Sequence, residues 1–217
     1  MTHKKPVALV TGASRGIGRA TCIELVNAGY HVLALARTVG ALEELADEVG
    51  DENITLIPQD LTNGQALEGL GPMVFDKFGR LDVFIANAGD ITSLTPTAQS
   101  DPSVWQRIFA VNVMANIHLI RTLDPLLRNA EKGKAIFVSS NVANDPRAYW
   151  GAYAASKAAL ESAVKCYASE VENTSMSVEI FNPGRAATKT RGVVYPGEDQ
   201  STLDTAEDVA KRLMDLV

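Results

Sequence analysis

The stretch TGASRGIG, Thr11–Gly18, follows the apolar run PVALV and leads directly into a helix-like run. Its three glycines, Gly12, Gly16 and Gly18, permit a tight turn and let the backbone approach a ligand closely. The helix that follows would present free N–H groups and the positive end of its dipole to a phosphate. A glycine-rich turn that only connects two elements is the alternative. The position between the first strand and the first helix favours dinucleotide binding.

Strand-like and helix-like stretches alternate from this loop onward. Continuous apolar runs such as VLALA and AIFVS are typical of parallel strands covered on both faces. The predicted strands are Pro6–Val10, His31–Ala36, Ile54–Ile57, Asp82–Ala86, Ala135–Ser139 and Val178–Phe181. The predicted helices are Ile17–Ala28, Gly40–Val49, Gln65–Phe78, Val104–Asn129, Gly151–Glu172 and about Thr205–Leu216. This alternation predicts a doubly wound parallel sheet (a Rossmann fold) with helices on both faces, in a single domain over residues 1–217.

Composition narrows the class of protein. The chain has 217 residues, 46% of them hydrophobic and 21% charged, as in ordinary globular domains. A net charge of -6 argues against broad electrostatic binding to nucleic acid or anionic lipid. No apolar run approaches the ~20 residues of a membrane span, and none near the N-terminus suits a secretory signal. We therefore expect a cytoplasmic protein with a small-molecule partner, and no nucleic-acid or membrane partner.

The cysteines and histidines point to no special chemistry. Cys22 and Cys166 lie in different predicted helices without CxxC spacing, so two buried free thiols are expected. His3, His31 and His118 are scattered without ligand spacing, so a metal site is not expected.

The spacing TGxxxGxG resembles that of the short-chain dehydrogenase/reductase family, and further motifs of that family follow in order. NAG at Asn87–Gly89 follows the fourth predicted strand, and Asn112 lies in the long helix. SS at Ser139–Ser140 closes the fifth strand, YAASK spans Tyr153–Lys157, and NPG at Asn182–Gly184 follows the sixth. The resemblance covers nearly the whole chain, and the ordered combination is specific where no single motif is.

The YAASK stretch places Tyr153 and Lys157 on one face of a helix, because residues four apart are neighbours there. The spacing alone fits a second interpretation as well, in which the two residues are a partly exposed pair on an amphipathic helix. The resemblance implies that Tyr153 is the general acid or base and that the Lys157 ammonium lowers its pKa and holds the nicotinamide ribose. It makes Ser140 the stabiliser of the oxyanion and Asn112 the residue that orders water for proton supply. Ser139 is expected to face the other way, as a packing residue.

The second predicted strand ends at Ala36, where a carboxylate would favour NAD(H). Arg37 and Arg15 could instead pair with a 2′-phosphate, which favours NADP(H) with NAD(H) as the alternative. The resemblance implies that Asp60 and Leu61 contact the adenine and that Thr188 holds the carboxamide. The residues predicted to bind the cofactor are Gly12, Ser14, Arg15, Gly16, Ile17, Gly18, Arg37, Asp60, Leu61, Asn87, Ala88, Gly89, Tyr153, Lys157, Pro183, Gly184 and Thr188.

The predicted activity is NADP(H)-dependent interconversion of a carbonyl and an alcohol. One alternative is a non-catalytic regulatory protein that binds a nucleotide, although it would not need Ser140, Tyr153 and Lys157 together. An isomerase or dehydratase on the same scaffold is the other. We expect Tyr149 to line the substrate pocket, and Arg185 either to meet an acidic substrate or to be solvated.

Family members usually follow the last helix with a seventh strand. This sequence ends at Val217 within that helix, so the sheet is expected to lack its last edge strand, either because the sequence stops early or because the strand is missing. The long helices Val104–Asn129 and Gly151–Glu172 are expected to pair in a homodimer or homotetramer, since their small residues let helices come close.

Overall fold

Parallel strands form one sheet in the order β3-β2-β1-β4-β5-β6 in the computed structural model, which describes residues 5–92 and 94–217. The strands are β1 (Val7–Thr11), β2 (His31–Ala36), β3 (Ile54–Pro58), β4 (Val83–Ala86), β5 (Lys134–Val138) and β6 (Ser177–Phe181). Strand order reverses where β4 pairs with the free side of β1. All of the predicted strands occur, to within one residue at each end, and the doubly wound fold is confirmed. β6 lies at one edge, and no strand follows it within the described residues.

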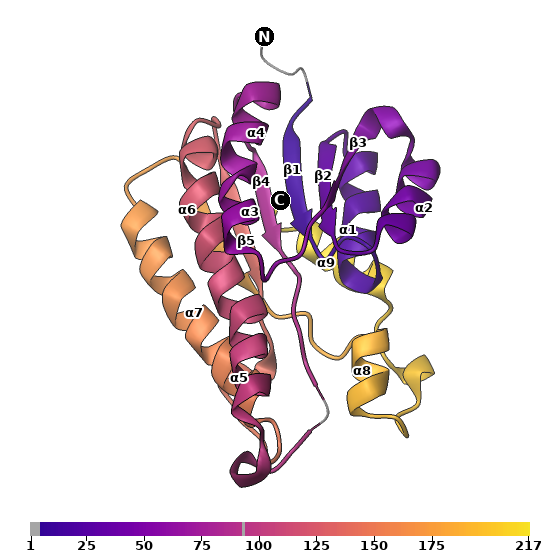
Figure 1. The fold of residues 1–217 in the computed structure, drawn as a ribbon. Coiled ribbons are helices and arrows are strands. Elements are labelled where there is room, and N and C mark those ends of the chain that lie inside the picture. The colour runs from indigo at the N-terminus through magenta and orange to yellow at the C-terminus, as the bar shows by residue number, and fades with distance from the viewer. Residues whose placement is uncertain (1–4, 93) are drawn as a thin grey trace.

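Helices cover both faces of this sheet (Figure 1). One face carries α1 (Gly16–Asn27), α2 (Val39–Val49) and α9 (Ala206–Met214). The other carries α3 (Gly64–Glu68), α4 (Leu70–Phe78), α5 (Pro102–Phe109), α6 (Ala115–Arg128) and α7 (Gly151–Val171). A short further helix, α8 (Lys189–Val194), lies apart from these layers in Figure 1. Within the described residues, every helix is too short or too polar to cross a membrane.

Successive side chains along the strands point to opposite faces of the sheet and pack into two separate hydrophobic cores. Val7 and Leu9 of β1 pack under α4, α6 and α7, whereas Ala8 and Val10 pack under α1, α2 and α9. This alternation is why all five residues of β1 are buried. In the first core, the rings of Phe84 and Phe137 meet edge to face with centroids 5.6 Å apart.

The predicted helix Gln65–Phe78 is wrong as a single element, because it is divided at Gly69 into α3 and α4. The hydroxyl of Thr122, on α6, accepts from the backbone N–H of Gly71 at 3.1 Å and donates to the carbonyl of Glu68 at 2.8 Å. It thereby satisfies backbone groups that the interruption leaves without helical partners.

The predicted helix Val104–Asn129 also differs from the structure. It begins earlier, at Pro102, where the Asp101 side chain accepts from the backbone N–H of Ser103 as an N-cap. A π-helical segment, Ala110–Met114, separates α5 from α6. Asn112 lies inside this segment, and asparagine has poor helix propensity.

The two cysteines differ in exposure. Cys22 is buried, as expected, and its burial raises the pKa of the thiol. Cys166 is exposed, so the prediction of a second buried thiol is wrong. It lies between Val164 and Tyr167, which are the α7 residues that face the core at that level, and so it points to the opposite side of the helix. His3 lies outside the described residues.

Candidate active site

The loop between β1 and α1 forms the floor of the site at the carboxyl ends of the strands. Gly12 and Gly16 have φ angles of 70° and 54°, a left-handed conformation that favours glycine. Gly18 has a different role. A Cβ built on it would overlap the carbonyl oxygen of Gly12 and the Asn87 amide, with the Gly12 carbonyl carbon 2.9 Å away. The first turn of α1 therefore packs directly against the loop.

The NAG motif holds this loop in place from the neighbouring strand β4. The Asn87 side chain donates to the backbone carbonyl of Thr11 at 3.0 Å. The backbone N–H of Ala88 donates to the Thr11 hydroxyl, also at 3.0 Å. These bonds fasten the ends of β1 and β4 to each other, at the point where the strand order reverses.

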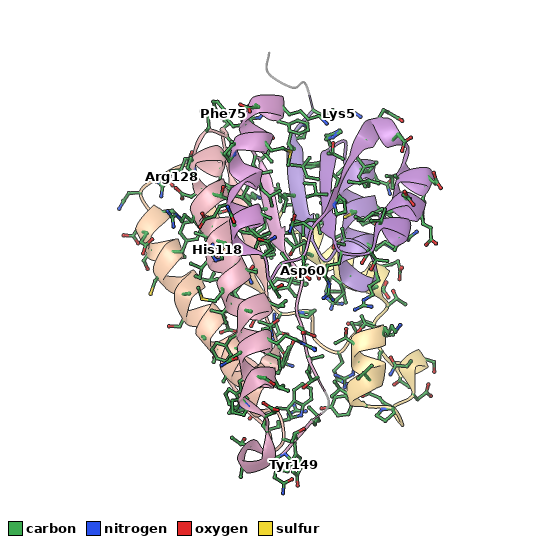
Figure 2. The ribbon with its side chains drawn as sticks, viewed as in Figure 1. Lys5, Asp60, Phe75, His118, Arg128 and Tyr149 are labelled. Atoms are coloured by element: carbon green, nitrogen blue, oxygen red, sulfur yellow. The ribbon has the colours of Figure 1, made fainter. Side chains whose placement is uncertain are left out.

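A cleft of about 370 Å³ opens above the loop. Its wall brings together all but one of the residues predicted to bind the cofactor: Gly12, Ser14, Arg15, Gly16, Ile17, Arg37, Asp60, Leu61, Asn87, Ala88, Gly89, Tyr153, Lys157, Pro183, Gly184 and Thr188. Gly18 lies behind the wall, against Gly12. Asp60 is labelled near the middle of the molecule in Figure 2, where the chain leaves β3.

Arg15 and Arg37 stand at one end of the cleft. The Arg37 side chain is 69% exposed, and its Nη1 lies 4.0 Å from a carboxylate oxygen of Asp60. The other oxygen of Asp60 accepts from the backbone N–H and the hydroxyl of Thr62, and these bonds lower the pKa of the carboxyl group. Arg37 is thus held only loosely, and its guanidinium remains accessible from the cleft. The glycine floor and the two cations fit a dinucleotide that carries an additional phosphate.

Three of the predicted catalytic side chains meet at the middle of the cleft. Lys157 is only 3% exposed; its Nζ donates to the carbonyl of Val138 at 2.8 Å and lies 5.9 Å from the centre of the Tyr153 ring. The Tyr153 hydroxyl forms a hydrogen bond with Ser140. The helix spacing therefore places Tyr153 and Lys157 together, and the end of β5 brings Ser140 to them.

The pKa of Tyr153 does not move in the predicted direction. Burial raises it, and the hydrogen bond with Ser140 opposes this rise only in part. The prediction that Lys157 lowers the tyrosine pKa is therefore wrong for the protein alone, because removal from water outweighs the stabilisation of the phenolate. Burial also lowers the pKa of Lys157 to about 8, while the negative charge of Glu161 opposes that shift. Tyr153 keeps its proton at neutral pH, as a proton donor must.

Asn112 is fully buried and lies behind the cleft rather than on its wall. Its Oδ1 accepts from the backbone N–H of Asp90 at 2.7 Å, and its Nδ2 donates to the Asp90 carbonyl and to the Ser156 hydroxyl. Its own backbone carbonyl accepts from the Asn116 side chain at 2.9 Å. In the structure Asn112 therefore fastens the segment after Gly89 to α7, and its role in ordering water stays a prediction.

The sequence analysis missed Glu161, which is 7% exposed. Ser139 donates to its Oε1 at 2.7 Å and Asn144 donates to its Oε2 at 3.0 Å. Ser139 is thus a buried hydrogen-bond donor and not the plain packing residue that was expected. Glu161 could have been found from its position, since it lies one helical turn after Lys157 on the same face of α7.

The substrate end also differs from expectation. Tyr149 has a φ of 74°, is 58% exposed and is labelled at the far end of the molecule in Figure 2. It lines a small side cavity rather than the main cleft, whose wall contains the next residue, Trp150. The Arg185 side chain is 62% exposed, forms an ion pair with Glu198 at 2.6 Å and does not line the cleft, so contact with an acidic substrate stays a prediction. The described residues contain no cluster of three or more side chains suited to a metal ion.

This fold and this cleft define a dinucleotide-binding α/β protein with a serine, a tyrosine and a lysine at its centre. The model of the short chain dehydrogenase family matches residues 6–199. The oxidoreductase YciK of Escherichia coli K12 is 35% identical over 94% of this chain and 82% of its own length. A short chain dehydrogenase structure from Salmonella enterica serovar Typhi superposes with a TM-score of 0.94 at 34% identity, covering 98% of this chain and 89% of that one.

A further structure, from Escherichia coli CFT073, was solved in complex with NADPH. It has a TM-score of 0.91 at 33% identity and covers 97% of this chain and 90% of its own. The chain belongs to the short-chain dehydrogenase family and is an oxidoreductase of that family, which confirms the resemblance in its motifs.

Proposed function

We propose that this protein interconverts a carbonyl and an alcohol with NADP(H), and that Tyr153 is the general acid and base. The observation that carries the proposal is the convergence of Ser140, Tyr153 and Lys157 on the same cleft as the glycine loop. A protein that only bound a nucleotide would need the loop and not this trio.

The reaction needs a hydride for carbon and a proton for oxygen. The reduced nicotinamide supplies the hydride when it is bound. The Tyr153 hydroxyl, which keeps its proton at neutral pH, would donate to the carbonyl oxygen. Ser140, whose single hydroxyl proton is directed at the Tyr153 oxygen in the protein alone, would turn that proton to the carbonyl oxygen as negative charge develops. The Lys157 ammonium would stabilise the phenolate that remains.

The preference for NADP(H) is proposed from the charges at the adenosine end. Arg15 and Arg37 line the cleft, and the ion pair that Arg37 forms with Asp60 is long, at 4.0 Å. A loosely held guanidinium can turn to pair with a 2′-phosphate through charge-assisted hydrogen bonds. The relative solved with NADPH supports this choice.

Spectroscopy with NADPH and NADH, run side by side over a panel of ketones, tests the function. We expect NADPH absorbance to fall with at least some ketones and Tyr153→Phe to abolish that fall. Tyr149→Phe is the matched control, because this tyrosine lies four residues earlier and outside the main cleft. Cofactor binding without turnover across a broad panel would favour a regulatory protein. Conversion of substrate without net loss of NADPH would favour an isomerase or dehydratase.

We also propose that the protein pairs through α6 and α7. Met114, at the end of the π-helical segment, is 50% exposed and Ile117 of α6 is 37% exposed, and pairing would bury both. Sedimentation at micromolar concentration should show a dimer or tetramer, and Ile117→Glu should shift it toward monomer. A wild-type protein that stays monomeric would refute this assembly.

A further inference from the structure

The substrate end of the cleft, beside Tyr153, carries on its wall a group of apolar side chains, two of them aromatic. The centre of the Trp150 ring lies 5.9 Å from that of Tyr153 and 5.9 Å from that of Tyr195. Trp150 precedes α7 and Tyr195 follows α8, so the contact between the two rings joins segments far apart in the sequence. The apolar and aromatic side chains of this wall are Ile91, Val111, Trp150, Val194 and Tyr195. Flat apolar surfaces of this kind favour a flat apolar ligand.

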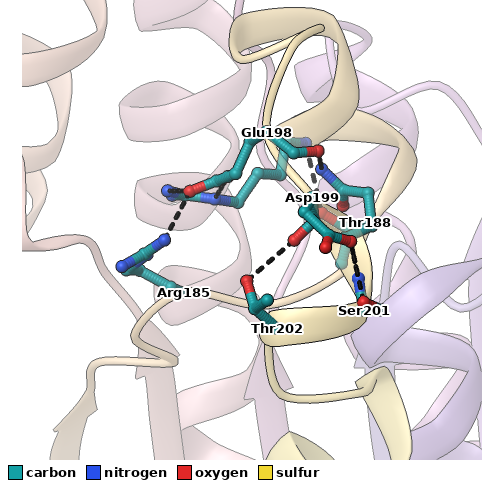
Figure 3. A network of polar contacts seen from close by, with 8 residues as sticks. Arg185, Thr188, Glu198, Asp199, Ser201 and Thr202 are labelled. Atoms are coloured by element: carbon teal, nitrogen blue, oxygen red, sulfur yellow. Dashed lines mark hydrogen bonds and ion pairs between the residues drawn. The ribbon is translucent and has the colours of Figure 1, made fainter.

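Two arginines lie close to this wall, but one carboxylate holds both. Arg191, which lines the cleft, donates to Glu198 from Nε and from Nη2, the latter at 2.8 Å. Arg185 donates to the same carboxylate at 2.6 Å. Figure 3 shows Arg185 pointing at Glu198, with the dashed bonds converging on its carboxylate. The side chain of Glu198 is only 16% exposed, less than either arginine.

The guanidinium of Arg191 makes a second contact, with the ring of Tyr195, and this contact further limits its access to a substrate. Its central carbon lies 4.5 Å from the centre of the Tyr195 ring, so one face of the guanidinium is stacked. The hydrogen bonds from Arg191, followed by those from Arg185, lower the pKa of Glu198 to about 2. The carboxylate is therefore charged at any pH used for an assay. Lys189 is the remaining cation on this part of the wall; it is exposed and adjoins Thr188, toward the cofactor end.

We propose that the substrate is a neutral aryl ketone, and that Glu198 disfavours carbonyl compounds bearing a carboxylate by neutralising Arg191, the arginine that lines the cleft. This inference rests on the proposed function and names the substrate class of the same site. A carboxylate at this position would have to share Arg191 with Glu198 and lie beside its negative charge, whereas an aromatic ring needs only the surface of Trp150 and Tyr195.

A matched pair of substrates tests the exclusion. 1-Phenyl-1,2-propanedione and phenylglyoxylate share the same aryl ketone. The first carries an acetyl group next to it and the second carries a carboxylate. We expect kcat/KM with NADPH to be at least about tenfold higher for the neutral compound. Glu198→Gln, which removes the charge but keeps the shape, should reduce that preference by about tenfold. Asp199→Asn is the control, since the neighbouring carboxylate of Asp199 accepts from Ser201 instead of an arginine.

A binding measurement separates this inference from the proposed function. Quenching of tryptophan fluorescence in the protein saturated with NADP⁺ should report 1-phenylethanol binding and weaker binding of mandelate. Tyr195→Leu should weaken the binding of 1-phenylethanol and leave the binding of 2-butanol unchanged. Equal or tighter binding of mandelate by the wild type would overturn the substrate class, even if NADPH is consumed with other ketones. Preferential binding of the aryl alcohol without any turnover would support the inferred ligand class and refute the proposed reductase activity. Thermal unfolding of each variant confirms that it is folded.

Discussion

Replacement of Gly18 by alanine is the sharpest test of how the glycine loop is built. The added Cβ would overlap the Gly12 carbonyl oxygen and the Asn87 amide, and would lie 2.9 Å from the Gly12 carbonyl carbon. Two of the three obstacles are backbone atoms of a loop that turns at a φ of 70°, so they cannot rotate away like a flexible side chain. The loop must shift, and the Asn87 bond to Thr11 must stretch with it.

Overpacking of this kind costs about 1–3 kcal/mol in unfolding free energy. For a chain of this size, each kcal/mol corresponds to a change of about 2–4 °C in Tm, so Gly18→Ala should lower Tm by about 2–12 °C. NADPH affinity should fall by about tenfold or more, because the backbone N–H groups that face the phosphates move with the loop. Thermal unfolding and titration of NADPH fluorescence measure the two effects.

Gly40→Ala is the control, because Gly40 also stands in the first turn of a helix. A Cβ there would meet no atom within 4 Å. Alanine should then stabilise the protein by about 0.4–1 kcal/mol, since it restricts the unfolded chain and suits a helix better, and NADPH affinity should stay unchanged. Should Gly18→Ala match Gly40→Ala in both Tm and NADPH affinity, the close approach of α1 to the loop would be refuted.

Three other changes probe the cofactor end, the lysine and the core. Arg37→Glu should weaken NADPH binding by about tenfold or more and spare NADH, as measured by fluorescence titration; equal losses for both would contradict the 2′-phosphate contact. Glu161→Gln removes the charge that raises the pKa of Lys157, which is about 8. Activity that needs the ammonium is lost as pH rises through that pKa, so the fall in kcat/KM should move to lower pH, and an unmoved profile would exclude this coupling. Phe137→Ala should cost about 3–5 kcal/mol in denaturant unfolding, because its ring is fully buried; a loss below about 1 kcal/mol would contradict the packing.

The strands and the motif residues could be predicted because their signals are local. A buried parallel strand such as β2 needs an unbroken apolar run, and six of its six residues are buried. Motifs at strand ends then fall at one sheet edge whatever the details of the packing, which places Ser140 at the cleft, and the first turn of α7 brings Tyr153 to it. The loop after β1 is equally local, since Gly12 and Gly16 each require their own φ.

What could not be predicted depends on contacts between distant segments. The break at Gly69 does have a signal within residues 65–78, because Pro72 has no N–H to donate to the carbonyl of Glu68. The hydroxyl of Thr122, which donates to that carbonyl instead, lies on another helix and could not be predicted. The helix α8 is short, and Glu198 ties Arg191 in it to Arg185 outside it. A single carboxylate that holds two arginines leaves no periodic pattern in the sequence.

For Tyr153 and Lys157, the sequence predicts one property of the pair and leaves another open. Helical spacing fixes which side chains are neighbours, so the ammonium could be placed near the phenol from the sequence. The pKa values depend in addition on how much water remains around both groups, which only the packed structure reveals. Burial drives both groups toward their neutral forms, the tyrosine pKa upward and the lysine pKa down to about 8. Glu161, held by Ser139 beneath the site, opposes the second shift. The buried carboxylate thus helps Lys157 to remain charged at neutral pH while Tyr153 keeps its proton, and that combination is the one that the proposed carbonyl reduction would require.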